Sequence, residues 1–278
     1  MKTKLNELRA MLSGLSCDGI CTAFSGGTDS SLLLTVLSEL RVQSPFPLLA
    51  VIFTTAFQTA EETRSAQALA AELGVPAEVV TFDVLSDPVI RMNPADRCYH
   101  CKRRLFTEMR RIAEARGLKY LTDGTNADDT KVYRPGRKAL EELGVVSPLA
   151  SCGFTKEDVR SAARELLVPT ADKPSSPCLA TRFPYGTELT DEALRRVERG
   201  EEYLRGIGLR TVRLRVHGPC ARLETDREGY RLVSEKRFEI GFELRDLGFA
   251  YSALDLEGFR SGSMDEPLVT ETEKPAGE

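Results

Sequence analysis

Three cysteines of the chain stand in settings that suit reactive sulfur. Cys178 lies in the loop-like stretch KPSSPCLATRFPYG, between a proline and the run LATR. Cys98 and Cys101 form a C-x-x-C pair in NPADRCYHCK, next to basic residues that favour the thiolate form. Cys178 is a candidate nucleophile, metal ligand or leaving sulfur atom, with a packed side chain as the alternative. Cys98 and Cys101 are expected to be reactive or ligated, and two cysteines without function at a helix start are the alternative.

The chain holds seven cysteines, an odd number that suits thiols and ligands better than disulfides in a reducing compartment. A zinc ribbon would need a second C-x-x-C or a histidine pair, which the sequence lacks. Zinc on the three cysteines with His100, or an iron–sulfur cluster on three thiolates, stays open. The other four cysteines are expected to be buried or incidental thiols: Cys17, Cys21, Cys152 and Cys220.

The segment SGGTDSS, residues 25–31, has the composition of a phosphate-binding loop. Gly26 and Gly27 allow a tight turn and close approach of a ligand, and the helix that follows points its free N–H groups there. Hydroxyl donors come from Ser25, Ser30 and Ser31. Asp29 suits a magnesium ion that bridges the phosphates. This is not a Walker motif, because no lysine follows the glycines; the alternative is a plain turn.

Two arginines predict a second anion site. Arg213 and Arg215 lie two apart in the strand-like RLRVHG, so they share one face and can converge on one phosphate. A solvated basic strand face is the alternative interpretation. Arg182 follows Cys178 by four residues and is a candidate catalytic residue that would steady a carboxylate or an adenylate.

Weaker candidates complete the set of site residues. Glu201 and Glu224 are possible members of an acidic metal-binding group. The turn DGTN contains Asp123, Gly124 and Asn126 at the end of an expected strand, where they would line a nucleotide pocket. A simple turn explains DGTN nearly as well.

The elements that must position these residues alternate along the chain. Strands are expected over 19–24, 47–57, 77–84 and 119–125, and helices after residue 28 and over 59–74, 101–117 and 155–169. Thr59 and Glu62 have the spacing of a capping box, and Gly74 is a stop signal. This order predicts an α/β fold with a parallel sheet, helices on both faces and a ligand at the carboxyl ends of the strands.

The pattern changes from Thr190 onward. A charged helix over 191–208, strands over 211–218 and 221–226, a helix over 230–248 and a last strand over 249–256 predict a smaller C-terminal α+β domain. We expect a first domain over 1–185, a second over 186–260 and a disordered tail over 261–278.

Composition limits the class of protein. The chain has 278 residues, of which 41% are hydrophobic and 29% charged, as in ordinary globular proteins. The start of the sequence lacks a signal-peptide core and no apolar run reaches the length of a bilayer span, so we expect a cytoplasmic protein without a membrane partner. A net charge of −4 gives no general attraction to nucleic acid.

The phosphate loop also carries a family resemblance. FSGGTDSSLL resembles the SGGxDS motif of the PP-loop ATP pyrophosphatases, which have an adenine nucleotide alpha hydrolase-like fold and transfer AMP from ATP to a substrate oxygen. Further segments make the chain similar to the LarE-type sulfurtransferases over roughly residues 20 to 225: NPADRCYHCK, DGTNADD with YRPGRKALEELGVVSPL, PCLATRFPYG and RLRVHGPCARLE.

This resemblance implies a specific reaction. With ATP and magnesium, the carboxylates of pyridinium-3,5-biscarboxylic acid mononucleotide are adenylated and become thiocarboxylates for the nickel-pincer cofactor of lactate racemase. It also implies that Arg213 and Arg215 bind the substrate phosphate. The sulfur comes from Cys178 itself, which is sacrificed to dehydroalanine, or from a 4Fe-4S cluster on Cys98, Cys101 and Cys178. Because all three cysteines are present, we favour the cluster.

The resemblance further implies a trimer-based homo-oligomer, up to a hexamer, and handover of the product to other proteins of nickel-pincer cofactor biosynthesis. Three other functions compete with this interpretation. A tRNA thiolase should carry an RNA-binding domain or a basic face, and an amidating enzyme of the NAD or GMP synthetase kind would depend on free ammonia here. A nucleotide-binding sensor module is the non-enzyme alternative.

Overall fold

The computed structural model describes residues 1–130, 135–174, 176–260, 263 and 264. It separates into two compact units, which are described one at a time. Unit 1 comprises Met1–Ile90 and Ala95–Ser176, and unit 2 comprises Arg91–Pro94 and Pro177–Glu278. Tyr133 and Arg134 of the motif quoted above lie outside the described residues, and of the expected tail over 261–278 only Ser263 and Met264 lie within them.

The division falls at Pro177, earlier in the sequence than the boundary at residue 186 that the change of pattern suggested. Hydrogen bonds explain the difference. Arg182 Nε donates to Glu201 Oε1 at 2.7 Å and Arg215 Nη1 donates to Thr181 O at 2.7 Å, which ties the segment with Cys178 to unit 2. Gly186 N and Leu189 N donate to Asn93 O at 2.9 Å and to Arg91 O at 2.7 Å, which ties Arg91–Pro94 to the same unit. The sequence reveals neither pairing.

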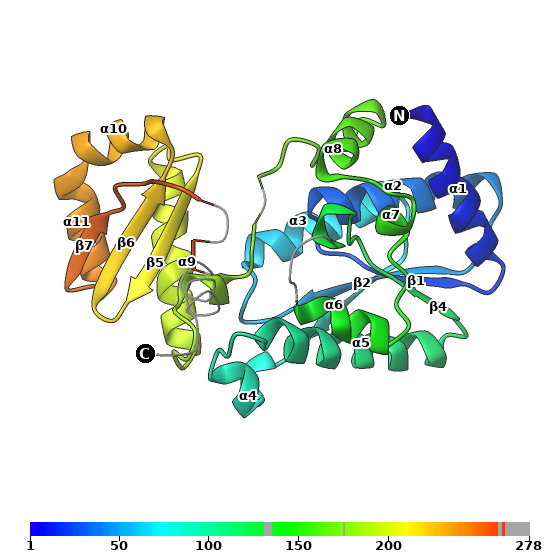
Figure 1. Cartoon of the computed structure of the whole chain (residues 1–278), viewed down its shortest axis with the longest axis horizontal. Coiled ribbons are helices and arrows are strands. Elements are labelled where there is room, and N and C mark those ends of the chain that lie inside the picture. Colours follow the sequence, from blue (N-terminus) through cyan, green and yellow to red (C-terminus); the bar gives the residue numbers. More distant parts are fainter. Residues whose placement is uncertain (131–134, 175, 261–262, 265–278) are drawn as a thin grey trace, which may run out of the picture. The chain divides into compact units, whose positions relative to one another are not determined.

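A parallel sheet forms the centre of unit 1 (Figure 1). In the described part of this unit, the strands run in the order β3-β2-β1-β4. Their bounds are β1 (Ile20–Ala23), β2 (Leu48–Thr54), β3 (Ala77–Thr81) and β4 (Tyr120–Thr122). Ile20 lies opposite Leu48 on one side and Tyr120 on the other, so β1 has a neighbour along both edges. The predicted parallel α/β sheet is confirmed.

Helices cover both faces of this sheet, as Figure 1 shows. They are α1 (Lys2–Ser16), α2 (Thr28–Gln43), α3 (Ala60–Glu72), α4 (Pro88–Arg91), α5 (Arg97–Ala115), α6 (Pro135–Glu142), α7 (Pro148–Ser151) and α8 (Lys156–Glu165), with short 3₁₀ turns at Val84–Ser86 and Asp128–Thr130. The predicted capping box begins α3: Glu62 N donates to Thr59 Oγ1 at 3.1 Å, and Thr59 N donates to Glu62 Oε2 at 3.0 Å.

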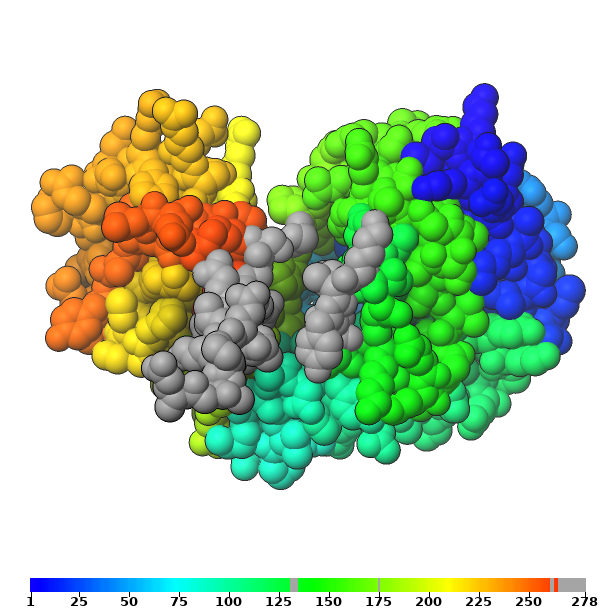
Figure 2. All heavy atoms as spheres, viewed as in Figure 1, coloured from blue at the N-terminus to red at the C-terminus, as the bar shows by residue number. Residues whose placement is uncertain are grey.

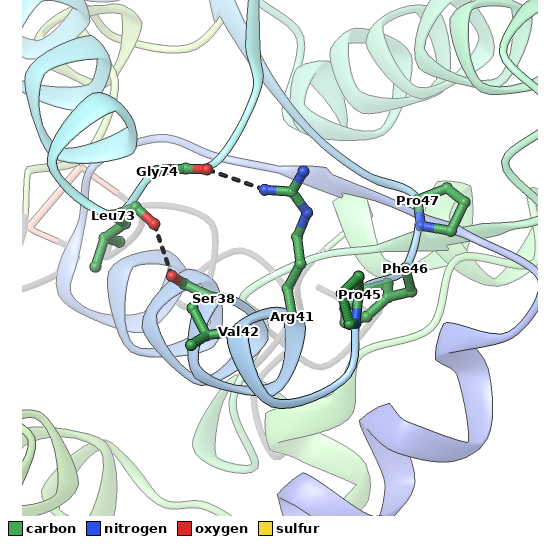
Figure 3. A pocket seen from close by; sticks show the side chains of 8 residues that line it. All are labelled: Ser38, Arg41, Val42, Pro45, Phe46, Pro47, Leu73 and Gly74. Carbon is green, nitrogen blue, oxygen red and sulfur yellow. Dashed lines mark hydrogen bonds between the residues drawn. The ribbon is translucent and has the colours of Figure 1, made fainter.

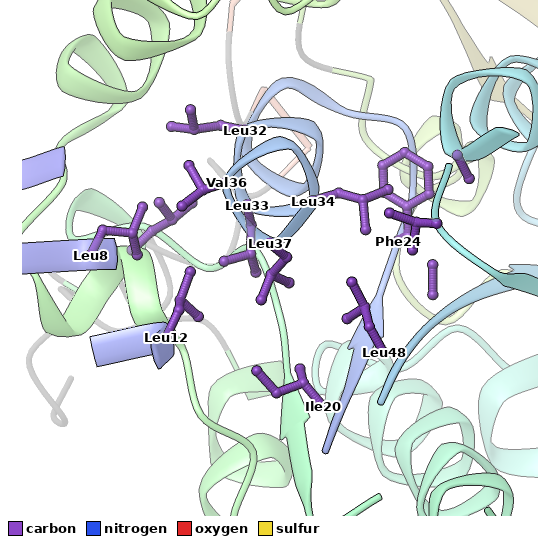
Figure 4. Packing of buried hydrophobic residues seen from close by; sticks show 14 of the residues in the cluster. Leu8, Leu12, Ile20, Phe24, Leu32, Leu33, Leu34, Val36, Leu37 and Leu48 are labelled. Atoms are coloured by element: carbon purple, nitrogen blue, oxygen red, sulfur yellow. The ribbon is translucent and has the colours of Figure 1, made fainter. Parts of the chain in front are cut away.

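Strand β2 explains why the core has two halves. Its side chains alternate in direction and all are apolar up to Phe53, so both faces of the sheet are buried. Ile52 packs with leucines of α1 and α2, the cluster drawn in Figure 4. Val51 and Phe53 pack on the opposite face with Phe106 and other residues of α5 and α6. The sheet is therefore a rigid platform for the loops at its carboxyl edge.

Unit 2 is an α+β unit, as predicted, and the structure shows that its sheet is mixed. Its elements are the 3₁₀ turn η3 (Leu179–Arg182), α9 (Asp191–Gly206), β5 (Val212–His217), β6 (Cys220–Thr225), α10 (Arg227–Glu235), α11 (Arg237–Asp246) and β7 (Tyr251–Leu254). The sheet order is β5-β6-β7, with β5 antiparallel and β7 parallel to β6. The single helix expected over 230–248 is wrong: Lys236 ends α10 and precedes α11, with ψ of 15°.

The outer elements of unit 2 are the most exposed. Phe238 and Phe242 of α11 and Tyr251 of β7 are largely open to solvent. Figure 2 shows α10, α11 and β7, coloured orange, at the surface of this unit. No helix in the part of the chain that the structure describes is long and apolar enough to cross a lipid bilayer.

Candidate functional site

The phosphate loop joins β1 to α2 and has the geometry of an anion-binding turn. Gly26 has φ of +69°, and a Cβ there would lie 3.1 Å from Ala66 Cβ, so only glycine fits this position without strain. Gly27 has an ordinary φ of −81° and is the N-cap of α2. No described side chain caps the first turn of α2. Its N–H groups are therefore available to an anion.

Hydroxyl groups brace the loop from within. Ser30 Oγ donates to Gly27 O at 3.1 Å and lies 3.1 Å from Ser25 Oγ. The Ser31 hydroxyl is fully buried and has no hydrogen-bond partner among the described residues. A buried polar group of this kind usually binds water or a ligand atom. The predicted residues Ser25, Ser30 and Ser31 thus lie together at the loop.

A second turn meets the phosphate loop, because β4 is the neighbour of β1. Gly124 lies against the start of α2, where a Cβ would come within 2.8 Å of Ser30 N. Asn126 Nδ2 donates to Asp29 Oδ1 at 3.0 Å. Asp123 is buried and accepts a hydrogen bond from Ser147 Oγ at 2.6 Å. The structure therefore brings Gly124 and Asn126 to the phosphate loop.

Two lysines that the sequence interpretation missed also lie at this loop. Lys156, the first residue of α8, contacts the Asp29 carboxylate through Nζ. Lys173 Nζ donates to Gly26 O at 3.2 Å. They are 127 and 147 residues away from their partners in the sequence, so a search next to the glycines could not find them.

The paired cysteines both lie inside α5. The helix, which was expected over 101–117, begins at Arg97, so Cys98 and Cys101 are its second and fifth residues and, three residues apart, share a face. Cys98 is exposed and Cys101 half-buried. Arg97 is buried and its Nη2 lies 3.7 Å from Cys98 Sγ. His100, the fourth ligand of the zinc alternative, has its Nε2 3.2 Å from an Asp96 oxygen.

Two of the remaining thiols are unsuited to nucleophilic attack. Cys21 lies in β1 and is buried in the cluster that packs against α5, and burial raises its pKa to about 12. Burial also raises the pKa of Cys152. Both thiols are therefore protonated at neutral pH, in line with the incidental role expected of them. Cys17 is exposed and Cys220 half-buried.

Arg182 anchors the loop that carries Cys178 in unit 2. Arg182 is 1% exposed, and its guanidinium pairs with Glu201, with Nε to Oε1 at 2.7 Å and Nη2 to Oε2 at 3.1 Å. Its Nη1 donates to the carbonyl oxygens of Pro177 and Cys178 at 2.8 and 3.3 Å and to Thr181 Oγ1 at 2.9 Å. The Arg182 donors therefore face groups of the protein.

Arg213 and Arg215 lie on the same face of β5, and both are buried. Arg215 Nε donates to Glu224 Oε2 at 3.0 Å, and its Nη1 donates to Thr181 O at 2.7 Å. Burial and the neighbouring charge of Arg182 lower the pKa of Arg213 to about 10. The environment in the fold therefore disfavours the charged form of Arg213, and a bound anion would stabilise that form.

Glu201 and Glu224, the candidate metal ligands, are both fully buried among arginines. Glu201 accepts from Arg182, from Arg205 at 3.0 Å and from Leu214 N at 3.0 Å. Burial opposes ionisation of Glu201, but the hydrogen bond and charge of Arg182 outweigh it and lower the pKa. Glu224 is 3.1 Å from Arg222 and accepts from Ser263 Oγ at 2.7 Å. The carboxylate oxygens of Glu201 and Glu224 accept hydrogen bonds from arginines, so they are not open to coordinate a metal ion.

The buried side chains of this cluster include three arginines, Arg182, Arg213 and Arg215, and three carboxylates, Glu201, Glu224 and Asp255. Arginine stays protonated in proteins, and two guanidinium groups on one strand face can bind one phosphate group. No three His, Cys, Asp or Glu side chains, over the residues with a described placement, are grouped to hold a metal ion.

Unit 1 contains a cavity of about 490 Å³, which is lined by the C-terminal half of α2, the segment before β2 and the end of α3 (Figure 3). Two polar side chains cross it: Arg41 Nη1 donates to Gly74 O at 3.0 Å, and Ser38 Oγ donates to Leu73 O at 2.7 Å. Because these groups tie α2 to the end of α3, the cavity is a gap in helix packing.

Comparison with known proteins identifies the family. No family model matches the chain. It is 39% identical over 271 residues to pyridinium-3,5-bisthiocarboxylic acid mononucleotide synthase of Lactiplantibacillus plantarum, covering 97% of this chain and 96% of that protein. Uncharacterized proteins of Synechocystis and Methanocaldococcus jannaschii are 38% and 31% identical, over 97% and 87% of this chain and 99% and 91% of those proteins. The chain therefore belongs to the LarE-type family of sulfurtransferases.

Proposed function

We propose that the chain is an ATP-dependent sulfurtransferase that converts the carboxylates of pyridinium-3,5-biscarboxylic acid mononucleotide into thiocarboxylates for the nickel-pincer cofactor of lactate racemase. The similarity to a synthase of the corresponding bisthiocarboxylic acid mononucleotide supports the substrate class. The observation that carries the proposal is the convergence of the phosphate loop, the turn with Asn126 and two lysines at the carboxyl edge of the sheet.

The first half of the proposed reaction activates the substrate. The N–H groups at the start of α2 and the ammonium groups of Lys156 and Lys173 hold the pyrophosphate part of ATP. The Asp29 carboxylate fits a magnesium ion, which prefers oxygen ligands and neutralises the phosphates when bound. A substrate carboxylate oxygen attacks the α-phosphorus, and pyrophosphate leaves. The resulting acyl-adenylate has AMP as a good leaving group.

The second half transfers sulfur. The Cys178 thiolate attacks the acyl carbon and AMP departs; cleavage of the Cβ–Sγ bond, with loss of the Cα proton, then releases a thiocarboxylate and leaves dehydroalanine. A 4Fe-4S cluster would supply a reusable sulfide instead, and we favour it because all three cysteines are present. Cys98 and Cys101, on one face at the start of α5, fit as two of its ligands.

The substrate phosphate is assigned to Arg213 and Arg215. Two guanidinium groups two residues apart on one strand can bind one phosphate from adjacent sides. The shared strand face of the two arginines and the lowered pKa of Arg213 support this assignment. The enzyme acts in the cytoplasm as a homo-oligomer, with a trimer or hexamer as its expected form, and passes its product to the next proteins of cofactor biosynthesis.

One assay separates this proposal from its rivals. Purified protein is incubated with ATP and magnesium, with and without the pyridinium substrate, and AMP, pyrophosphate and thiocarboxylate are measured. The proposal expects AMP release that depends on the substrate and a sulfur-containing product. AMP release that depends on tRNA would identify a thiolase, and release that depends on ammonia an amidating synthetase. ATP binding without any turnover would indicate a sensor.

A further inference from the structure

A chain of buried polar contacts runs from the framework of unit 2 to the backbone around Cys178. Glu201 lies on α9 and accepts a hydrogen bond from Leu214 N of β5 at 3.0 Å, so its carboxylate is fixed by two elements. Arg182 pairs with both oxygens of this carboxylate. The other end of the guanidinium reaches the carbonyl oxygens of Pro177 and Cys178.

These contacts fix the peptide groups on both sides of the Cys178 Cα. With both carbonyls held, Sγ can move only by rotation about the Cα–Cβ bond. Thr181 strengthens the same arrangement: its hydroxyl accepts from Arg182 at 2.9 Å and donates to Cys178 O at 2.8 Å. Arg215 holds the other end of the turn through Thr181 O at 2.7 Å.

We propose that Arg182 and Glu201 are positioning residues that hold the Cys178 loop in its reactive geometry, and that neither contacts the substrate. This inference rests on the proposed sulfur transfer. A fully buried ion pair contributes little to stability, because desolvation of two charges cancels much of their attraction. Its value here is geometric, since the fork of a guanidinium can bind a carboxylate and two carbonyls at once.

The test compares three variants by hydrogen exchange and kinetics. The double variant Arg182→Met/Glu201→Leu replaces the ion pair with apolar side chains, a change that buried pairs often tolerate. Arg182→Lys keeps the charge but cannot form the fork. Arg205→Met is the matched control, because Arg205 binds the same Glu201 oxygen at 3.0 Å without touching the loop.

Hydrogen exchange is measured on the peptide with residues 177–183, whose Thr181 and Phe183 amides are hydrogen-bonded within the turn. In the double variant and in Arg182→Lys, these amides should exchange roughly ten-fold faster or more, while a peptide from β6, residues 220–225, keeps its rate. The kcat should fall about a hundred-fold with KM within three-fold, because misplacement of a reacting group costs rate rather than binding. Arg205→Met should match wild type in both.

Two results would overturn the inference: unchanged exchange and turnover in the double variant, or a raised KM with unchanged exchange, which would place Arg182 on the substrate. If the β6 peptide also exchanges faster, the double variant is unfolded, and the exchange and kcat of Arg182→Lys then decide. Hydrogen exchange needs no ATP, substrate or product. A wild type that makes no thiocarboxylate would therefore contradict the proposed function and leave the positioning test intact.

Discussion

Lys156 and Asn126 hold the two oxygens of the Asp29 carboxylate. Lys156 Nζ contacts Oδ2, and Asn126 Nδ2 donates to Oδ1 at 3.0 Å. Asp29 is the residue assigned to magnesium, so the ammonium of Lys156 neutralises the same charge that the metal would. When a metal ion binds this carboxylate, the ammonium is free to interact with the phosphates beside it.

We therefore expect Lys156→Met to weaken ATP binding in the presence of magnesium by about ten-fold or more. A hydrogen bond to a charged group contributes about 1.5–3 kcal/mol, which corresponds to that factor. Isothermal titration calorimetry measures the change. Lys138→Met is the control, because Lys138 lies on α6 and pairs with Glu142 instead. Equal ATP affinity in Lys156→Met and wild type would remove Lys156 from the nucleotide site.

Substitution of the two glycines of the phosphate loop should affect two different properties, ATP binding and stability. Gly27→Val should abolish ATP binding with the fold retained, since its Cβ meets only Ser25 Oγ at 3.5 Å. Gly26→Ala should lower the free energy of unfolding by roughly 1–3 kcal/mol, because φ of +69° strains any other residue. Urea denaturation and calorimetry separate the effects. Undiminished ATP affinity in Gly27→Val would contradict the pyrophosphate assignment.

Arg213→Met should separate binding from stability. Loss of one charge-assisted contact should weaken binding of the pyridinium mononucleotide about ten-fold or more. The melting temperature should stay the same or rise, because burial and Arg182 disfavour the Arg213 cation at pH 7, well below its lowered pKa of about 10. ATP affinity should hardly change. Equal losses of ATP and substrate affinity would show that Arg213 does not select the substrate phosphate.

Product stoichiometry decides the sulfur source. If Cys178 is sacrificed, each chain transfers one sulfur atom to the substrate, and its mass falls by that of one hydrogen sulfide molecule. The Cys98→Ala and Cys101→Ala variants should still carry out this single transfer. If the three cysteines hold a cluster, each substitution removes the iron, and added sulfide supports many turnovers. Intact-protein mass, product per chain and iron content measure this. Dehydroalanine at residue 178 with one product per chain would contradict the cluster.

An ion pair between α1 and α8 should make stability depend on acid pH. Lys4 Nζ lies 2.6 Å from Asp158 Oδ2, and hydrogen bonds from Lys4 and Thr155 lower the Asp158 pKa from 3.8 to about 2. The stabilisation is fully present above pH 3.8 and is lost as the pH falls through about 2. The gap in unfolding free energy between wild type and Lys4→Met should therefore shrink from pH 6 to pH 2.

Urea denaturation across this pH range measures the gap. Lys119→Met, which removes an exposed pair with Asp18, serves as the control and should change stability little at any pH. A gap between wild type and Lys4→Met that stays constant down to pH 2 would show that Asp158 does not titrate with the pair.

The local signals in the sequence predicted most of unit 1. The Gly-Gly turn, the capping box at Thr59 and the apolar run of β2 each depend on neighbouring residues, and the structure has all three. Lys156 and Lys173 were missed because their partners are distant in the sequence. Contacts of this kind arise from the order of strands in the sheet, which residue spacing does not encode.

The roles of charged residues in unit 2 were harder to predict. Arg182 was expected at the substrate, but its guanidinium faces Glu201 and backbone carbonyls. Glu201 and Glu224 were expected to bind metal, but arginines occupy their oxygens. Sequence spacing identifies residues that share a strand face, as for Arg213 and Arg215. It does not show which opposite charges meet across α9, β5 and β6.

Residues Arg91–Pro94 belong to unit 2, although Ala95–Ser176 of unit 1 separate them in the sequence from the rest of that unit. Asn93 is fully buried there and donates to Pro184 O at 2.8 Å. A polypeptide that starts at residue 177 would therefore lack an internal part of its own fold. Without residues 91–94, the backbone groups of residues 183–189 would lose these partners, so an expressed fragment of unit 2 should need the segment supplied in trans.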